Sequence, residues 1–400
     1  MSSQRAVPSI PRIPAIDGLR GIAVLCVILM HCFMSTRTSG LRMLDPIVEN
    51  VLKLSMPLAV DLFFVISGFL ITSILDRTRD ADRPLRTFYA RRALRIVPLY
   101  YAFLLFVALF LSDLPARIVG PPGSMTWEFL FLTNIPAALD PKSVGALYPH
   151  FWTLAVEEQF YILWPLVILI LPQRFNIRIC LALIGLSVVT RLALSLTVSF
   201  EAALILTPAR SDALAAGSIV GLLYHRNPDF LRTWWKQLMR FAGFGFLAAQ
   251  AVFILTYAWN VKASFVFSVT VMPFIATVFF AAAVAGLALR QESDGGPRWL
   301  LNPVLTSTAR YSYGMYAIHV PLITLLYHYG LIVQRDPVAG FDLPYRIYFF
   351  ILIAGLSYGV GLVTWHLYEK QFLKLTPSYR YSGETEPTQA ALPAGAIPVP

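Results

Sequence analysis

Hydrophobic residues run along this chain in long stretches that short polar segments separate. The stretches are about 20 residues long, which is the length an α-helix needs to cross the hydrocarbon core of a bilayer. This pattern predicts an all-α polytopic membrane protein, a bundle of about ten transmembrane helices. The predicted spans are residues 16–34, 56–75, 94–112, 151–171, 178–199, 203–224, 239–258, 264–289, 311–333 and 346–368. A shorter apolar piece, 127–139, is interpreted as interfacial or re-entrant.

The composition agrees with this class. Of the 400 residues, 57% are hydrophobic and only 14% are charged, which is too few charges for a water-soluble domain. The net charge of +10 is compatible with nucleic-acid binding, but the basic residues lie in the loops between spans, so we expect no nucleic-acid partner. All three cysteines lie in apolar segments, and no disulfide framework is predicted.

The distribution of basic residues predicts the orientation in the membrane. If the N-terminus faces the cytoplasm, the inner segments hold 21 Lys and Arg residues and the outer segments hold 8. Cytoplasmic loops are the ones that carry such an excess, so we expect both termini inside. Residues 1–12 then form a cytoplasmic tail, 13–375 the membrane domain, and 376–400 a Pro/Ala-rich cytoplasmic tail with the composition of a disordered segment.

The first predicted span contains ionisable residues, which are costly inside a membrane. Arg20 and His31 are eleven residues apart, so they share one helix face and lie roughly 16 Å apart along the axis. One alternative is an arginine that reaches the interface and a structural histidine. The other is a ligand path with a cation at its inner end and an imidazole near the outer face.

Depth in the membrane brings further charged residues together. With the predicted orientation, His31, Asp61 and the Glu157/Glu158 pair converge on one depth from three spans. Buried polar pairs also hold helix bundles together. Several carboxylates beside one imidazole favour a catalytic site, however, and we predict His31, Asp61 and Glu157 as its members.

The inner end has a basic cluster of its own. Arg92 and Arg95 are three residues apart on the third span, so they share a helix face. Such a loop can simply mark the cytoplasmic side, but paired guanidinium groups are also a common clamp for phosphates. Arg20 lies at a similar depth, so Arg20, Arg92 and Arg95 are predicted to bind an anionic cytosolic ligand.

At five places the chain resembles the acyltransferase-3 family of integral membrane O-acyltransferases. The segments, in family order, are IDGLRGIAVLCVILMH, VDLFFVISGFLIT, FYARRALRIVPLYY, HFWTLAVEEQFYILWP and RYSYGMYAIHVPL. The first carries the family's Arg-x10-His as Arg20 and His31, and the third carries its Arg-x-x-Arg pair as Arg92 and Arg95. The resemblance covers most of 13–375 and implies a stand-alone membrane enzyme without the C-terminal hydrolase-like domain of many members.

The resemblance implies a cytosolic acyl-CoA donor, acetyl-CoA being the first expectation, and a hydroxyl acceptor, often on a carbohydrate. It also implies location in a bacterial inner membrane. The residues fit this chemistry, because arginines can hold the phosphates of the donor while His31 removes the proton of the acceptor hydroxyl. An imidazole with an ordinary pKa of about 6.5 suits that task, and Asp61 or Glu157 is expected to orient it. Direct transfer and a covalent acyl-histidine both remain open.

Other assignments are weaker. Cys32 is turned about 100° from His31 on the helix, so a packing role is expected for it. Among the remaining histidines, His319 is the one most expected to contact substrate. No metal is predicted.

The competing class is a transporter or flippase with a proton-coupled network of buried charges, which ten spans with intramembrane ion pairs would also suit. The outer connection 112–150 is expected to shape the choice of acceptor.

Overall fold

The computed structural model describes residues 12–35, 45–257, 259–291, 296–332, 343–379 and 381. Within these residues the chain is helical and contains no β-strand. The long helices are α1 (Pro14–Ser35), α2 (Asp45–Arg77), α3 (Pro84–Phe110), α7 (Trp152–Ile170), α8 (Gln173–Thr197), α10 (Thr207–Arg226), α11 (Pro228–Tyr257), α12 (Val261–Gln291), α13 (Pro303–His328) and α14 (Leu343–Thr364). The short helices are α4 (Ala116–Val119), α5 (Met125–Phe129), α6 (Asn134–Leu139), α9 (Phe200–Ile205) and α15 (Lys370–Leu373). The remaining turns are η1 (Pro141–Ser143), η2 (Pro149–Phe151), η3 (Arg298–Leu301), the π-helical η4 (Trp365–Glu369) and η5 (Thr376–Ser378).

Eight described stretches are long and apolar enough to cross a membrane. They are Pro14–Met34, Leu58–Arg77, Pro84–Phe110, Pro149–Ile170, Gln173–Thr197, Pro228–Tyr257, Val261–Gln291 and Pro344–Ser378. The prediction of an all-α, multi-span membrane protein is therefore confirmed. The predicted sixth and ninth spans correspond to α10 and α13, which are long but more polar, and both are largely buried among the other helices.

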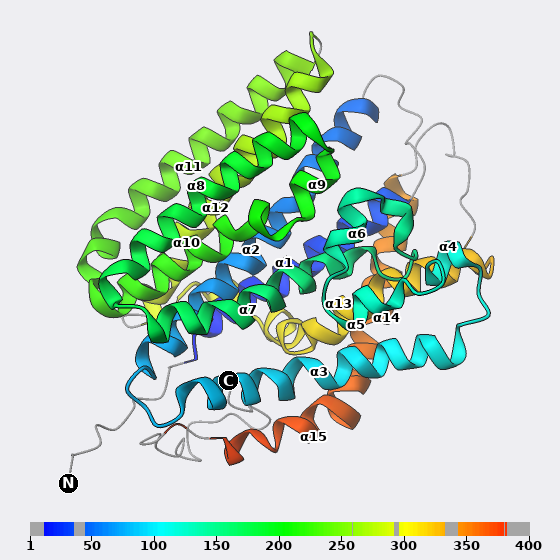
Figure 1. Ribbon diagram of the computed structural model, residues 1–400. Coiled ribbons are helices and arrows are strands. Elements are labelled where there is room, and N and C mark those ends of the chain that lie inside the picture. Colours follow the sequence, from blue (N-terminus) through cyan, green and yellow to red (C-terminus); the bar gives the residue numbers. More distant parts are fainter. Residues whose placement is uncertain are drawn as a thin grey trace.

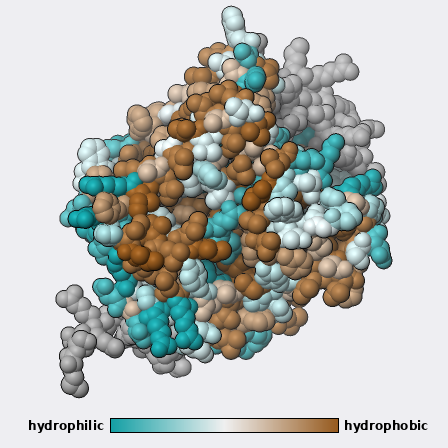
Figure 2. All heavy atoms as spheres, in the orientation of Figure 1, coloured by the Kyte–Doolittle hydropathy of each residue, from teal (hydrophilic) through white to brown (hydrophobic). Residues whose placement is uncertain are grey.

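The helices pack as two groups that share α1 and α2 (Figure 1). On one side α10 packs against α2, α8 and α12, and α11 packs on α12. On the other side α1 packs against α13, and α13 packs against α14. The space-filling view shows broad hydrophobic areas on the surface (Figure 2). Large aromatic side chains are exposed on the long helices, among them Phe110 of α3 and Phe241 and Phe244 of α11, which suits a surface that faces lipid.

Contacts between helix ends relate the directions of α2, α7, α8 and α10 to one another. Arg79, just after α2, donates to the carbonyl oxygen of Ile168 near the end of α7 at 2.5 Å. Arg226, at the end of α10, forms an ion pair with Asp76 of α2 and donates to the carbonyl oxygen of Gln173 at 3.2 Å. The ends of α2, α7 and α10 and the start of α8 therefore lie together on one side of the bundle.

The chain ends are described only in part. Of the predicted tail 1–12 the structure describes Arg12, whose Nε donates to Asp17 Oδ2 at 2.6 Å. Of the predicted tail 376–400 it describes 376–379 and 381, and Arg91 Nε donates to the carbonyl oxygen of Tyr379 at 2.6 Å. The rest of both segments lies outside the described residues, and their boundaries remain predictions.

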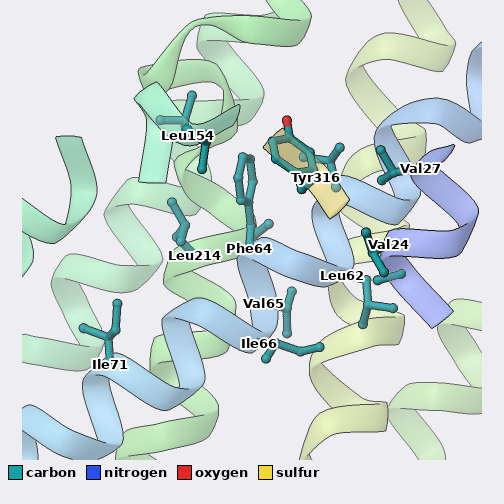
Figure 3. Close-up of a cluster of buried hydrophobic side chains, with 14 of the residues drawn as sticks. Val24, Val27, Leu62, Phe64, Val65, Ile66, Ile71, Leu154, Leu214 and Tyr316 are labelled. Carbon is teal, nitrogen blue, oxygen red and sulfur yellow. The ribbon is translucent and has the colours of Figure 1, made fainter. Parts of the chain in front are cut away.

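The centre of the bundle is a continuous apolar core. Figure 3 shows part of it, with Phe64 of α2 between Leu154 of α7 and Tyr316 of α13. Leu214 of α10 and Val24 of α1 belong to the same cluster of buried side chains. Helices that are far apart in sequence therefore meet on the two faces of α2.

One of these contacts is unusually close, because α2 and α10 meet through glycines. A Cβ atom placed on Gly68 would lie 2.0 Å from the carbonyl oxygen of Leu214. A Cβ on Gly217 would lie 2.0 Å from the carbonyl oxygen of Val65. Small residues allow membrane helices to approach backbone to backbone in this way, so α2 and α10 form one tightly joined pair.

Replacing either glycine should therefore separate α2 from α10. We expect Gly68→Ala and Gly217→Ala each to lower the free energy of unfolding by about 1–3 kcal/mol, because the added methyl group meets main chain that cannot move aside. Thermal unfolding and monodisperse yield of the purified protein in detergent would measure this effect.

Gly185→Ala in α8 and Gly359→Ala in α14 are the matched controls, since a Cβ at either position has no neighbour within 4 Å. These two variants should be as stable as the parent or slightly more stable, because alanine favours a helix over glycine. Equal unfolding temperatures for Gly68→Ala and Gly359→Ala would contradict the close-packing interpretation.

Candidate active site

A pocket opens between α1, α2, α3, α7 and α13. It holds about 990 Å³ of empty space, its open mouth included, and Arg20, Arg92 and Arg95 all line it. Arg20 comes from α1, and the other two come from one face of α3. The structure therefore brings the three predicted donor-binding residues to one place.

A hydrogen-bonded chain of polar groups lies beside these arginines. Ser67 Oγ donates to Glu157 Oε1 at 2.8 Å, and the Tyr161 hydroxyl donates to Ser67 Oγ at 3.0 Å. The Arg92 guanidinium lies 4.4 Å from the centre of the Tyr161 ring, and its buried Nε has no hydrogen-bond partner among the described residues. Three cations facing one carboxylate leave the pocket with an excess of positive charge, which favours an anionic ligand.

Beyond the arginines the pocket is apolar. The residues of α2 that line it are Val60, Phe63, Phe64, Ile66, Ser67, Leu70 and Ile74. From Ile74 to Val60 the axis of α2 rises by about 21 Å, so the pocket follows a long stretch of the helix. At its far end the Thr153 Oγ and the Tyr316 hydroxyl are 2.5 Å apart, and both residues line the pocket.

Three histidines gather next to this far end. His319 Nε2 lies 3.2 Å from His31 Nδ1, and the two ring centres are 4.9 Å apart. The ring of His150 is 5.0 Å from the ring of His319. His319 follows Tyr316 by one turn of α13, and Tyr316 also donates to the carbonyl oxygen of His150. The arginines thus line the pocket itself, and the imidazoles lie next to it, beside the lining residue Tyr316.

The histidines differ in exposure. His319 and His150 are buried, at 0% and 2% exposure, whereas His31 is half-buried. In the described part of the chain, no three His, Cys, Asp or Glu side chains form a group that could hold a metal ion.

Asp61 lies on the other side of α2, facing α10. Its carboxylate forms a buried ion pair with Arg210, next to a second buried pair in which Arg191 Nη2 donates to Asp212 Oδ2 at 2.7 Å. All four residues are fully buried. The structure therefore places Asp61 with the α10 arginine and not in the pocket beside His31.

Glu157 is also placed differently from the prediction. It is in the pocket, as expected of a site residue, but its carboxylate accepts from Ser67 and shares the pocket with the three arginines. The predicted convergence of His31, Asp61 and Glu157 on one depth says nothing about the direction in which each side chain points. Of these three, only His31 lies in the histidine cluster.

The outer connection folds back against the spans. The Tyr100 hydroxyl of α3 donates to the carbonyl oxygen of Glu128 at 2.7 Å, and Gln159 Nε2 of α7 donates to the carbonyl oxygen of Phe131 at 3.0 Å. Burial raises the pKa of Glu128 to about 7, and both of its carboxylate oxygens lack a hydrogen-bond partner among the described residues. The last residues of the connection reach the histidine cluster, since the Thr324 hydroxyl of α13 donates to the carbonyl oxygen of Ala146 at 3.0 Å and the ring of His150 lies beside that of His319.

Comparison with known proteins decides the class of this site. The family model of the acyltransferase-3 domain, described as an acyltransferase domain, matches residues 13–366. The chain belongs to the acyltransferase-3 family. The prediction of an acyltransferase is thereby confirmed, and the family assignment decides against the competing transporter.

Two relatives of this acyltransferase come from Staphylococcus aureus. "O-acetyltransferase OatA" of strain NCTC 8325 / PS 47 is 39% identical over 131 residues, which cover 30% of this chain and 21% of the relative. "Putative O-acetyltransferase SACOL0978" of strain COL is 26% identical over 390 residues, which cover 88% of this chain and 59% of the relative. The chain thus spans less than two thirds of the length of these relatives. No solved structure matches the acyltransferase.

Sequence reasoning did not bring three groups of this acyltransferase together. It ranked His319 and His150 below His31, although both lie in the His31 cluster, and it gave no role to Ser67. The spacing of residues along α2 was the signal that could have shown that Ser67 and Asp61 lie on different faces of this helix. Val60, Phe63, Ser67, Leu70 and Ile74 recur at the spacing of one helix face, whereas Asp61, Val65 and Gly68 form another.

The pairing of Asp61 with Arg210 makes a prediction. Asp61→Ala should lower the free energy of unfolding by about 3–5 kcal/mol, because it leaves a buried guanidinium without its counter-ion. Replacing both partners, as Asp61→Leu with Arg210→Met, should recover much of this loss. Folded yield and thermal unfolding in detergent would be measured.

Asp76→Ala is the matched control. Asp76 also lies on α2 and also pairs with an arginine of α10, but this arginine, Arg226, is partly exposed. Its loss should cost about 1 kcal/mol or less. If Asp61→Ala were as stable as Asp76→Ala, the structural role of the buried pair would be wrong.

Proposed function

We propose that this acyltransferase moves an acyl group, in the first instance acetyl, from cytosolic acyl-CoA to a hydroxyl of a carbohydrate or other glycosylated acceptor, with His31 as the general base. The observation that carries the proposal is a pocket that three arginines line, with the histidine cluster next to its lining residue Tyr316. The names of the two relatives support acetyl as the group and oxygen as the acceptor atom.

The shape of the pocket suits a long donor with a charged head. Coenzyme A has phosphates at one end and a long, narrow pantetheine arm that ends in the thioester. Arg20, Arg92 and Arg95 would hold the phosphates through charge-assisted hydrogen bonds, and guanidinium groups suit this because they can bind two oxygens at once. The apolar wall of α2 would then guide the arm towards Tyr316 and the histidines.

The reaction follows from that arrangement. The acceptor hydroxyl attacks the thioester carbonyl carbon while His31 takes the hydroxyl proton. The carbon–sulfur bond breaks, the new ester leaves, and the proton on His31 passes to the departing thiolate. The products are an O-acyl acceptor and free coenzyme A. No acyl-enzyme is needed in this scheme, because both substrates meet beside one base.

The membrane orientation is part of the proposal. We place the protein in the bacterial plasma membrane with both termini in the cytoplasm, because the basic residues Arg79 and Arg226 lie at the helix ends that gather on one side of the bundle. The arginine end of the pocket then opens towards cytosolic acyl-CoA. The histidine end lies under the outer connection, where an acceptor from the other side would enter.

Donor binding should depend on the arginine pair. We expect Arg92→Ala or Arg95→Ala to weaken acetyl-CoA binding by about 1.5–3 kcal/mol each, which is roughly a 10- to 150-fold rise in Kd. Lysine at either position should restore only part of the affinity, because its ammonium group lacks the planar fork. Calorimetric titration of the purified protein with acetyl-CoA would give the values.

Arg91→Ala controls for the loss of one cation from the same turn of α3, since Arg91 does not line the pocket and instead contacts Tyr379 and Tyr381. It should bind donor like the parent. A pair of alanine variants at 92 and 95 with unchanged Kd would rule out the phosphate-binding role.

The base should control the rate and not the donor affinity. We expect His31→Gln to lower kcat by about 10²–10⁴-fold, the usual effect of removing a general base. Donor affinity should stay within about twofold of the parent, because the phosphates are held roughly 16 Å away at the Arg20 end. The measurement is transfer of labelled acetyl, expressed per mole of donor-binding protein.

Cys32→Ala tests the neighbouring thiol under the same conditions. Cys32 is buried and lies on a different face of α1 from His31, so this variant should transfer acetyl at close to the parent rate. A folded His31→Gln protein with the parent rate would remove His31 from the mechanism.

A further inference from the structure

One partner of His31 in this structure is another imidazole. The sequence led us to expect a carboxylate, Asp61 or Glu157, but Asp61 is paired with Arg210 and Glu157 accepts from Ser67. The ring nitrogen that meets His31 Nδ1 is His319 Nε2, at 3.2 Å. His319 is fully buried, so this contact is shielded from water.

Two backbone carbonyls determine which nitrogens carry hydrogen. A carbonyl oxygen only accepts, so His319 Nδ1, at 2.7 Å from the Tyr316 carbonyl oxygen, must donate to it. A neutral imidazole has one N–H, which leaves the lone pair of His319 on Nε2. In the same way His31 Nδ1, at 3.0 Å from the Val27 carbonyl oxygen, carries the hydrogen of that ring.

These two tautomers fit each other. The one Nδ1–H of His31 is shared between the Val27 carbonyl oxygen, at 3.0 Å, and the Nε2 lone pair of His319, at 3.2 Å, so a donor also meets an acceptor across the contact between the rings. The lone pair of neutral His31 is then on Nε2, the nitrogen that can take a proton from a hydroxyl. The order Tyr316 carbonyl, His319, His31 is thus a consistent series of hydrogen bonds that prepares His31 to act as a base.

We propose that His319 is the positioning residue of His31, in the place that a carboxylate occupies in a catalytic triad. The proposal rests on the function proposed above, in which His31 is the general base. His319 holds the ring of His31 in the base-competent tautomer. It also accepts a charge-assisted hydrogen bond from Nδ1–H once Nε2 has taken the proton of the acceptor hydroxyl.

The proton balance needs no other group. His31 Nε2 gains the hydroxyl proton as the new carbon–oxygen bond forms, and it returns that proton to the sulfur when the carbon–sulfur bond breaks. His319 keeps its own Nδ1–H on the Tyr316 carbonyl throughout. A neutral partner also avoids a second buried charge inside the membrane when His31 is neutral.

The structure fixes His319 firmly enough for this role. Its ring lies 5.5 Å from the ring of Tyr316 and 5.0 Å from that of His150. The Tyr316 side chain is in turn tied to Thr153 and to the His150 carbonyl oxygen. The angle at which His319 meets His31 is therefore determined by three packed helical segments.

The test compares two amides at position 319. His319→Gln can place a carbonyl oxygen near the former Nε2, where it can still accept from His31. His319→Asn is one carbon shorter and reaches only the level of the former Nδ1, so it lacks that acceptor. We expect Asn to lower kcat for acetyl transfer by about 10- to 100-fold and Gln to recover at least half of this loss on a logarithmic scale, with the KM for acetyl-CoA unchanged in both.

A double variant separates positioning from a structural effect. Because His319 acts through His31, adding His319→Asn to His31→Gln should change the residual rate by less than about twofold. Equal kcat for the Asn and Gln variants, or an undiminished effect of His319→Asn when His31 is already absent, would overturn the positioning role.

The two proposals fail in different ways. If His31→Gln keeps the parent rate, His31 is not the base and the proposed function itself is wrong at that residue. If His31→Gln has a lowered kcat while His319→Asn keeps the parent kcat, the assignment of His31 as the base is retained and only the positioning role of His319 is wrong. His225→Gln, at the other end of the bundle beside Arg77, controls for replacing a histidine by an amide and should keep the parent kcat and KM.

Discussion

The close contact between α2 and α10 is the constraint on which the rest of the structure depends. Gly68 and Gly217 bring the two backbones together, and the Asp61–Arg210 ion pair lies on the same face of α2. In a membrane, where hydrophobic burial does not drive one helix against another, such packing and pairing supply the attraction. With one face of α2 held in this way, its opposite face is directed at the pocket. The donor-binding proposal therefore relies on a contact that touches no ligand.

Much of the fold could be predicted from the sequence, because each span is a local pattern. Hydrophobic length predicted the helices, and Arg20, Arg92 and Arg95 were placed together by depth alone, since all three lie near one end of their predicted spans. Depth worked for them because the arginines line one pocket. Depth gives the position of a residue along a span, but it does not give the direction in which the side chain points around the helix axis.

The remainder could not be predicted because it depends on rotation of each helix about its axis. Asp61 and Ser67 are six residues apart on α2, so their side chains point in directions about 120° apart around the helix axis, and one faces α10 while the other faces Glu157. The meeting of His31 with His319 depends further on how α1 packs against α13, two helices almost 300 residues apart in the chain. No periodicity within either helix contains that information.

The order in which the pocket can form follows from the same long-range packing. Its walls come from α1, α2, α3 and α7, all within the first 170 residues, and from α13, which begins at Pro303. During synthesis the first four helices must wait in the membrane while α8 to α12 are made, because chains are synthesised from the N-terminus. Until α13 inserts, Arg20 lines an open cleft and His31 has no imidazole partner. The wall that α13 supplies, together with the contact between His319 and His31, is therefore the last part of this site to be synthesised.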